Sequence, residues 1–156
     1  MPAPTPSYVK NMISRSLREI VDPSPTKKAK ERIWKFFDYQ CAYCGKLLRK
    51  TQKEGHIDHL SPTSLGGSNH ISNLVLSCAT CNEAEKLDGA WQEFILRKNQ
   101  DPEVVRTRIA KIREWQRLNG GPVLDKNKLC EIDRLSELAA AYYDMKVKEA
   151  RKLRYS

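Results

Sequence analysis

Two cysteine pairs, Cys41-Ala42-Tyr43-Cys44 and Cys78-Ala79-Thr80-Cys81, enclose the stretch His56-Ile57-Asp58-His59 and decide the fold of this 156-residue chain. Two residues between thiolates allow both sulfurs of a pair to reach one tetrahedral metal ion at about 2.3 Å. Four cysteine ligands leave no open position for a substrate, so we expect a structural zinc ion on Cys41, Cys44, Cys78 and Cys81. That ion would close a long loop of chain, and an aspartate–histidine pair lies inside the loop.

The composition, with 40% hydrophobic and 30% charged residues, is typical of one globular domain with a modest core. The net charge of +9 is uneven, because basic segments lie on both sides of a mildly acidic centre. This pattern fits a metal-dependent site within a polyanion-binding surface, and general solubility charge explains it too. No apolar run is long enough to cross a membrane and Met1-Pro2-Ala3-Pro4 is no signal peptide, so we expect a cytoplasmic protein. In that compartment cysteine pairs are metal ligands more often than disulfides.

The sequence around the cysteine pairs predicts a strand, a loop, a second strand and a helix. Gly45 supplies the turn of a tight knuckle over residues 39–48. Residues 56–60 and 71–77 are the expected strands, separated by a proline- and glycine-containing loop. A helix is expected to begin at Asn82, directly after the second cysteine pair.

Helices are predicted on both sides of this region. Residues 1–7 are expected to form a loose tail, followed by one helix that ends before Pro23 and another over residues 26–37. Three helices are expected after the cysteine region. Asp88 can cap the first, Asp101-Pro102 begins the second, and the third covers residues 126–152. We expect that last helix to place six apolar side chains on one face, for packing within the chain or for a homodimer: Leu129, Ile132, Leu135, Leu138, Tyr142 and Met145. Cys130 lies in the same apolar pattern and is predicted to be buried.

Asp58, His59 and Asn82 supply the groups that hydrolysis of a phosphodiester requires. Such a reaction needs a base that deprotonates water and a divalent ion that offsets the charge developing on the phosphate. Asp58 and Asn82 are oxygen donors, which Mg²⁺ and Mn²⁺ prefer, and His59 is the neutral-pH base beside them. Adjacent residues of a strand point to opposite faces, so a bend at the strand end would have to bring Asp58 and His59 to one phosphate.

Together with Gly66-Gly67-Ser68-Asn69 and Asn73-Leu74-Val75-Leu76, these motifs resemble the zinc-containing HNH endonucleases of the ββα-metal superfamily. The resemblance covers residues 38–87. It implies an α+β, mostly helical chain, in which a ββα-metal core with a four-cysteine zinc site is flanked by N-terminal and C-terminal helices. We therefore expect three segments: a tail and helices over residues 1–37, the nuclease core over 38–87, and a helical region over 88–156 for DNA contact or dimerisation.

The same resemblance assigns a role to each motif residue. His59 matches the general base that activates water, and Asn73 matches the central asparagine that braces the loop and orients the base. Asp58 and Asn82 match ligand positions for the catalytic Mg²⁺ or Mn²⁺. The family often carries a basic residue three positions after the last motif residue, where this chain has Glu85, followed by Lys86. The implied reaction is hydrolysis of DNA, double-stranded in the simplest case.

Basic side chains outside the motif are candidates for holding the DNA backbone, and an ordinary solvated surface explains them equally well. They are Lys27, Lys28, Lys30, Lys35, Lys86, Arg106, Arg113 and Arg117. Two functions remain open from the sequence. One is an endonuclease of a restriction, phage or mobile-element system, which would need a homodimer or two sequential nicks to cut both strands. The other is a non-catalytic, zinc-stabilised nucleic-acid-binding module.

Overall fold

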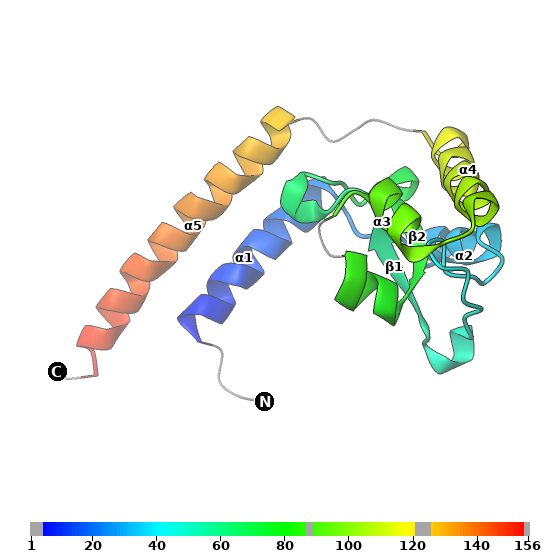
Figure 1. Ribbon diagram of the computed structural model, residues 1–156. Coiled ribbons are helices and arrows are strands. Elements are labelled where there is room, and N and C mark those ends of the chain that lie inside the picture. Colours follow the sequence, from blue (N-terminus) through cyan, green and yellow to red (C-terminus); the bar gives the residue numbers. More distant parts are fainter. Residues whose placement is uncertain (1–4, 87–88, 121–125, 155–156) are drawn as a thin grey trace. The chain divides into compact units, whose positions relative to one another are not determined.

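The computed structural model describes residues 5–86, 89–120 and 126–154, and these form two compact units (Figure 1). We call Ser24–Val123 the core unit, and Met1–Pro23 together with Leu124–Ser156 the helix pair. This division differs from the three segments expected from the sequence, because the second helix and two of the later helices pack around the strands. In the described part of the chain, no helix combines the length and the apolar character needed to cross a membrane.

A two-stranded antiparallel sheet lies at the centre of the core unit. Strand β1 (Gly55–His59) pairs with β2 (Leu74–Cys78), and the register runs from Gly55 opposite Cys78 to His59 opposite Leu74. Every residue of β2 is buried. Residues 71–73, which were expected to extend this strand, instead form a 3₁₀ turn, because the side chain of His70 accepts the backbone N–H of Ser72 and caps that turn.

Three helices surround the sheet: α2 (Lys27–Phe36), α3 (Trp91–Lys98) and α4 (Pro102–Leu118). Side chains of Thr26 and Asp101 cap α2 and α4, and the cap at Asp101 agrees with the sequence prediction. Trp115 of α4 reaches into the sheet, where its Nε1 donates to the carbonyl of Leu74 at 2.8 Å and to that of Ile71 at 3.0 Å. The α+β, mostly helical fold is confirmed, whereas the expected cap Asp88 lies outside the described residues.

The helix pair consists of α1 (Pro6–Val21) and α5 (Lys126–Lys152). They lie side by side (Figure 1), and Lys10 Nζ contacts Asp144 Oδ2 at 2.9 Å. Helix α1 begins earlier than predicted, because Thr5 accepts the backbone N–H of Tyr8 and Pro6 stands in the first turn. The expected loose tail is therefore shorter than residues 1–7.

Most of the apolar side chains expected on one face of α5 are exposed, so packing against α1 does not account for them, and their role in a homodimer stays a prediction. Ile132 is buried at 4% exposure, whereas four of the other predicted members are largely exposed: Leu135, Leu138, Tyr142 and Met145. Cys130 is exposed as well, so its predicted burial is wrong. Within this unit α5 packs against a single helix, and one neighbour covers only one side of a helix.

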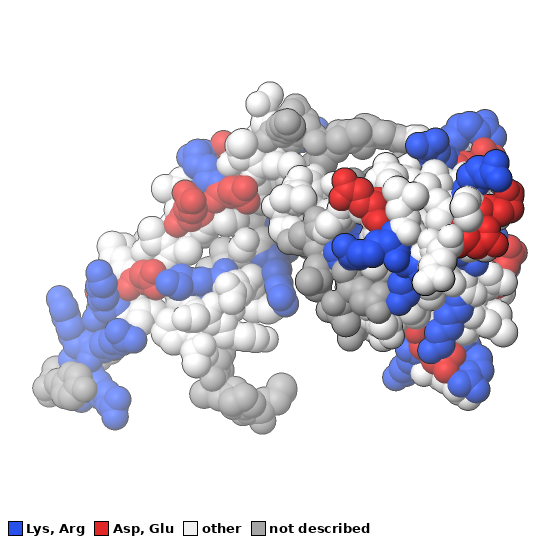
Figure 2. All heavy atoms as spheres, in the orientation of Figure 1, with Lys and Arg blue, Asp and Glu red and all other residues white. Residues whose placement is uncertain are grey.

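Lys and Arg side chains gather at the C-terminal end of α5 (Figure 2). The exposed residues there are Lys146, Lys148, Arg151, Lys152 and Arg154. Cations at this position are favoured by the partial negative charge of a helix C-terminus. They also add to the positive surface that a polyanion would meet.

Candidate active site and metal centre

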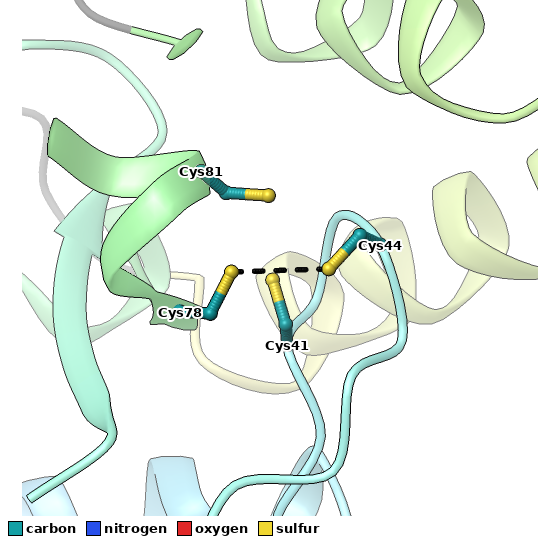
Figure 3. A group of neighbouring side chains, drawn as sticks. All are labelled: Cys41, Cys44, Cys78 and Cys81. Carbon is teal, nitrogen blue, oxygen red and sulfur yellow. Dashed lines mark hydrogen bonds between the residues drawn. The ribbon is translucent and has the colours of Figure 1, made fainter. Parts of the chain in front are cut away.

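Four cysteine sulfurs meet where the knuckle approaches the end of β2 (Figure 3). Cys41 and Cys44 come from the knuckle, Cys78 ends β2, and Cys81 lies in the following π-helix η4 (Thr80–Lys86). All four sulfurs lie within 4.8 Å of one another, and those of Cys44 and Cys78 are 3.8 Å apart. Zinc–sulfur bonds of about 2.3 Å in a tetrahedron place the sulfurs about 3.8 Å apart. The cluster can therefore hold a metal ion such as zinc.

The turn of the knuckle depends on Gly45, which has a φ of +78°. Its backbone N–H donates to the carbonyl of Cys41, and a Cβ at this position would collide with the guanidinium of Arg108 from α4. Arg108 also donates through Nη1 to the Cys41 carbonyl at 3.2 Å. A cation therefore lies against the knuckle, where it can offset part of the negative charge of four metal-bound thiolates.

The thiols of Cys41, Cys44 and Cys81 have strongly shifted pKa values. Hydrogen bonds from Cys44 and Cys81 lower the pKa of Cys41, and the bond with Cys41 raises the pKa of Cys44 to about 11. The pKa of Cys81 is raised by its bonds with Cys41 and Cys44. Four thiolates this close together repel one another, and a divalent cation at their centre would remove that cost.

Asp58 lies in a buried polar group between the knuckle and η4. Its Oδ2 accepts a hydrogen bond from the Tyr43 hydroxyl at 2.6 Å and lies 3.2 Å from Lys86 Nζ. Burial, followed by the charge of Asp58, raises the pKa of Tyr43 well above its usual value of 10, so this hydroxyl keeps its proton and donates. The position of Tyr43 within the knuckle does not by itself indicate this contact, because Asp58 lies 15 residues further along the chain.

Lys86 has a different position from the one predicted. Its side chain is 2% exposed, and its ammonium donates to the carbonyl of His59 at 2.8 Å besides contacting Asp58. The expectation that Lys86 is a surface contact for nucleic acid is therefore wrong for this structure. A buried ammonium needs a charge partner, and Asp58 provides it.

His59 lies at the end of β1 and is half-buried. Its Nε2 is 2.9 Å from Oδ1 of Asn69. An amide oxygen only accepts hydrogen bonds, so Nε2 is the donor and Nδ1 of the neutral ring carries the lone pair. Asn69 belongs to the motif Gly66-Gly67-Ser68-Asn69, and only its contact with His59 reveals a role for it.

Asn73 braces the loop between the strands. Its Oδ1 accepts the backbone N–H of Ser61 at 2.8 Å, and its Nδ2 donates to the carbonyls of Ser61 at 3.0 Å and Ser68 at 2.8 Å. At Gly67 a Cβ would lie 1.8 Å from the Ser61 carbonyl oxygen, so the loop closes tightly at this glycine. These contacts fix the segment that leads into Asn69, the partner of His59.

The remaining predicted residues occupy separate places. Asn82 is a half-buried residue of η4, the helix that also carries Lys86 to the end of β1. The predicted DNA contacts on α2 and α4 are all exposed: Lys27, Lys28, Lys30, Lys35, Arg106, Arg113 and Arg117. Arg106 and Arg117 form ion pairs with Glu103 and Glu114 of the same helix.

Residues 41–91 match the family model described as HNH endonuclease. Together with the two strands, the following helix and the cysteine cluster, this match identifies the segment as an HNH endonuclease domain and confirms the family resemblance. A domain of this family supports a nuclease-type function and implies a nucleic-acid substrate.

A similar protein is the "SPbeta prophage-derived putative HNH endonuclease YoqL" of Bacillus subtilis (strain 168). The two chains are 33% identical over 89 residues, which make up 51% of this chain and 36% of the relative. The matched region thus spans little more than a third of the relative's length.

Proposed function

We propose that the core unit is a metal-dependent endonuclease that hydrolyses DNA phosphodiester bonds, with His59 as the general base. The contact between His59 and Asn69 carries this proposal, because it fixes the ring and leaves Nδ1 to accept a proton. Asn73 supports this arrangement indirectly, by holding the loop on which Asn69 stands. His59 would take the proton of a water molecule as that water attacks phosphorus.

Asp58 and Asn82 are the proposed ligands for the catalytic Mg²⁺ or Mn²⁺. Both offer oxygen, the donor that these ions prefer, and Asp58 has a second carboxylate oxygen besides the Oδ2 that contacts Tyr43 and Lys86. When bound, the ion supplies positive charge that offsets the charge developing on the phosphate and on the leaving oxygen. The four cysteines are the proposed ligands of a separate, structural zinc ion, because thiolates suit zinc better than they suit magnesium.

The exposed basic side chains of α2 and α4 are the proposed contacts for the DNA backbone. Double-stranded DNA is the proposed substrate, cut by a homodimer or by sequential nicks, because one active site cleaves one strand. Among restriction, phage and mobile-element settings, the prophage origin in the relative's name favours a phage setting.

A plasmid-nicking assay with Mg²⁺ or Mn²⁺ tests the reaction. We expect the wild-type protein to convert supercoiled plasmid to open circles, and His59→Ala to lower the rate by about 10²–10⁴-fold. Cys130→Ser is the control, because Cys130 is exposed in the helix pair, outside the unit that carries the proposed chemistry, and should leave cleavage intact. Intact plasmid with every divalent ion would contradict the enzyme, and DNA retention without cleavage would support the non-catalytic binding module instead.

A further inference from the structure

Tyr43 joins the proposed structural metal site to the proposed catalytic one. It lies inside the first cysteine pair, one residue before Cys44, and is completely buried. Its hydroxyl donates to Asp58 Oδ2 at 2.6 Å, the length of a strong hydrogen bond to a charged acceptor. A single side chain thus spans from the knuckle to the end of β1.

The position of the Tyr43 ring is determined by its neighbours. The ring of Phe94 in α3 meets it edge to face, with centroids 5.4 Å apart and planes at 78°. The backbone carbonyl of Tyr43 accepts from Asn99 Nδ2 at 3.1 Å, and the preceding residue, Ala42, donates its N–H to Leu76 of β2 at 2.8 Å. With the ring and backbone held in this way, the hydroxyl has little freedom to move relative to the sheet.

We propose that Tyr43 is a positioning residue for the catalytic ion, and that the metal-bound knuckle orients the ligand Asp58 through it. This inference rests on the proposed function, because it takes Asp58 as a ligand of the catalytic ion. A carboxylate has two oxygens, so Asp58 can keep the Tyr43 bond at Oδ2 while its other oxygen binds the ion. Such partners of metal ligands typically change metal affinity or activity by about 10–100-fold when they are removed.

A purely structural role for the hydroxyl would have a different consequence. Tyr43→Phe would then lower the melting temperature, because the carboxylate of Asp58 loses a buried partner. The affinity for the catalytic ion, measured on folded protein, would stay unchanged. The positioning role instead predicts weaker binding of the ion with the structural zinc still in place.

The deciding experiment compares Tyr43→Phe with the wild type in two Mn²⁺ titrations. Mn²⁺ binding is followed by the electron paramagnetic resonance of free Mn²⁺ in a His59→Ala background, and cleavage is followed on plasmid without that substitution. We expect the half-saturating Mn²⁺ concentration to rise about tenfold or more, the rate at saturating Mn²⁺ to approach that of wild type, and zinc to remain at the wild-type content. Tyr39→Phe is the matched control, because that ring is part of the same unit, is 38% exposed and contacts Trp34.

Unchanged Mn²⁺ titrations in a folded, zinc-containing Tyr43→Phe protein would overturn the inference. If that variant loses zinc or does not fold, Phe94→Leu is used instead to test the inference. This substitution keeps the Tyr43 hydroxyl and removes the ring that packs against Tyr43. Phe94→Leu should weaken Mn²⁺ binding by a smaller factor, and unchanged binding would overturn the inference. Failure of the proposed function would look different. A wild-type protein that binds Mn²⁺ but does not cleave DNA would refute the nuclease function. The binding titration would still test the role of Tyr43.

Discussion

The core unit and the helix pair are stabilised in different ways. The buried hydrophobic cluster lies wholly within the core unit, where every residue of β2 is buried and the cysteines can bind a metal ion. Among described residues, the helix pair has one buried hydrophobic side chain, Ile132, and many exposed ones. The residues of the proposed chemistry all belong to the unit with the dense core, which can hold them in fixed positions.

The tryptophans offer a way to observe the two units separately. All three, Trp34, Trp91 and Trp115, belong to the core unit. Tryptophan fluorescence therefore reports on the core unit alone, whereas far-UV circular dichroism also includes the long helix α5.

Removal of the structural metal should have the largest effect. Cys78→Ser should release the ion and unfold the core unit, because structural zinc binding contributes about 10–16 kcal/mol of apparent free energy in small zinc domains. Tryptophan emission should shift to longer wavelength while part of the helical dichroism remains. Acidification should act in the same direction, since protons compete with the metal for thiolates. Cys130→Ser is the control, because Cys130 is exposed, and native emission after chelation of the metal would refute the prediction.

Replacement of Trp115 should have the next largest effect. Trp115→Phe removes the donor to the Ile71 and Leu74 carbonyls and leaves a cavity, so the free energy of unfolding should fall by about 2–4 kcal/mol. This change in the free energy of unfolding is measured by urea denaturation, monitored through the fluorescence emission of the two remaining tryptophans. Leu118→Ala, on an exposed side of the same helix, should change it by less than about 0.5 kcal/mol. Equal effects of the two substitutions would show that Trp115 does not hold α4 to the sheet.

Ile132→Ala tests the helix pair. It should destabilise this unit by about 2 kcal/mol, because Ile132 is its one buried apolar side chain among described residues. The change should appear in the dichroism of α5 and leave the tryptophan transition unmoved. Leu138→Ala, in the same helix at 56% exposure, is the matched control. A matching shift of the tryptophan transition would mean that the two units unfold together.

The ion pair between Lys10 and Asp144 should have the smallest effect. Its side chains are 36% and 45% exposed, so water and salt screen the attraction. Lys10→Met should change the free energy of unfolding of the helix pair by at most about 0.5 kcal/mol, with less effect in high salt. If thermal denaturation shows a loss of stability above about 1 kcal/mol, this ion pair contributes more to joining α1 and α5 than a screened surface pair can.

Much of the fold could be predicted from local signals. Residue type alone indicates the helix caps at Thr26 and Asp101 and the turn at Gly45. Strand β1 begins and ends within one residue of the predicted strand. Which apolar side chains of α5 are buried could not be predicted in this way. Helical periodicity indicates which residues share a side, but the number of neighbouring helices depends on packing.

Only those residues of the candidate site that belong to a recognisable family motif could be predicted from the sequence. The HNH resemblance indicates Asp58, His59, Asn73 and Asn82, whereas their supporting partners come from distant turns. Tyr43 contacts Asp58 across 15 positions of sequence, and Asn69 contacts His59 across 10 positions. Lys86 resembles a phosphate contact in the sequence, and only the packing of η4 against β1 shows that its charge is buried.

The order of the elements along the chain also has a consequence for biosynthesis. Helix α1 precedes the core unit along the chain, whereas its partner α5 follows the entire core unit. The core unit has all its elements available before α5 is made, so it can fold and bind its metal while the apolar side of α1 still lacks a partner. The helix pair can therefore assemble only after the core unit has been synthesised.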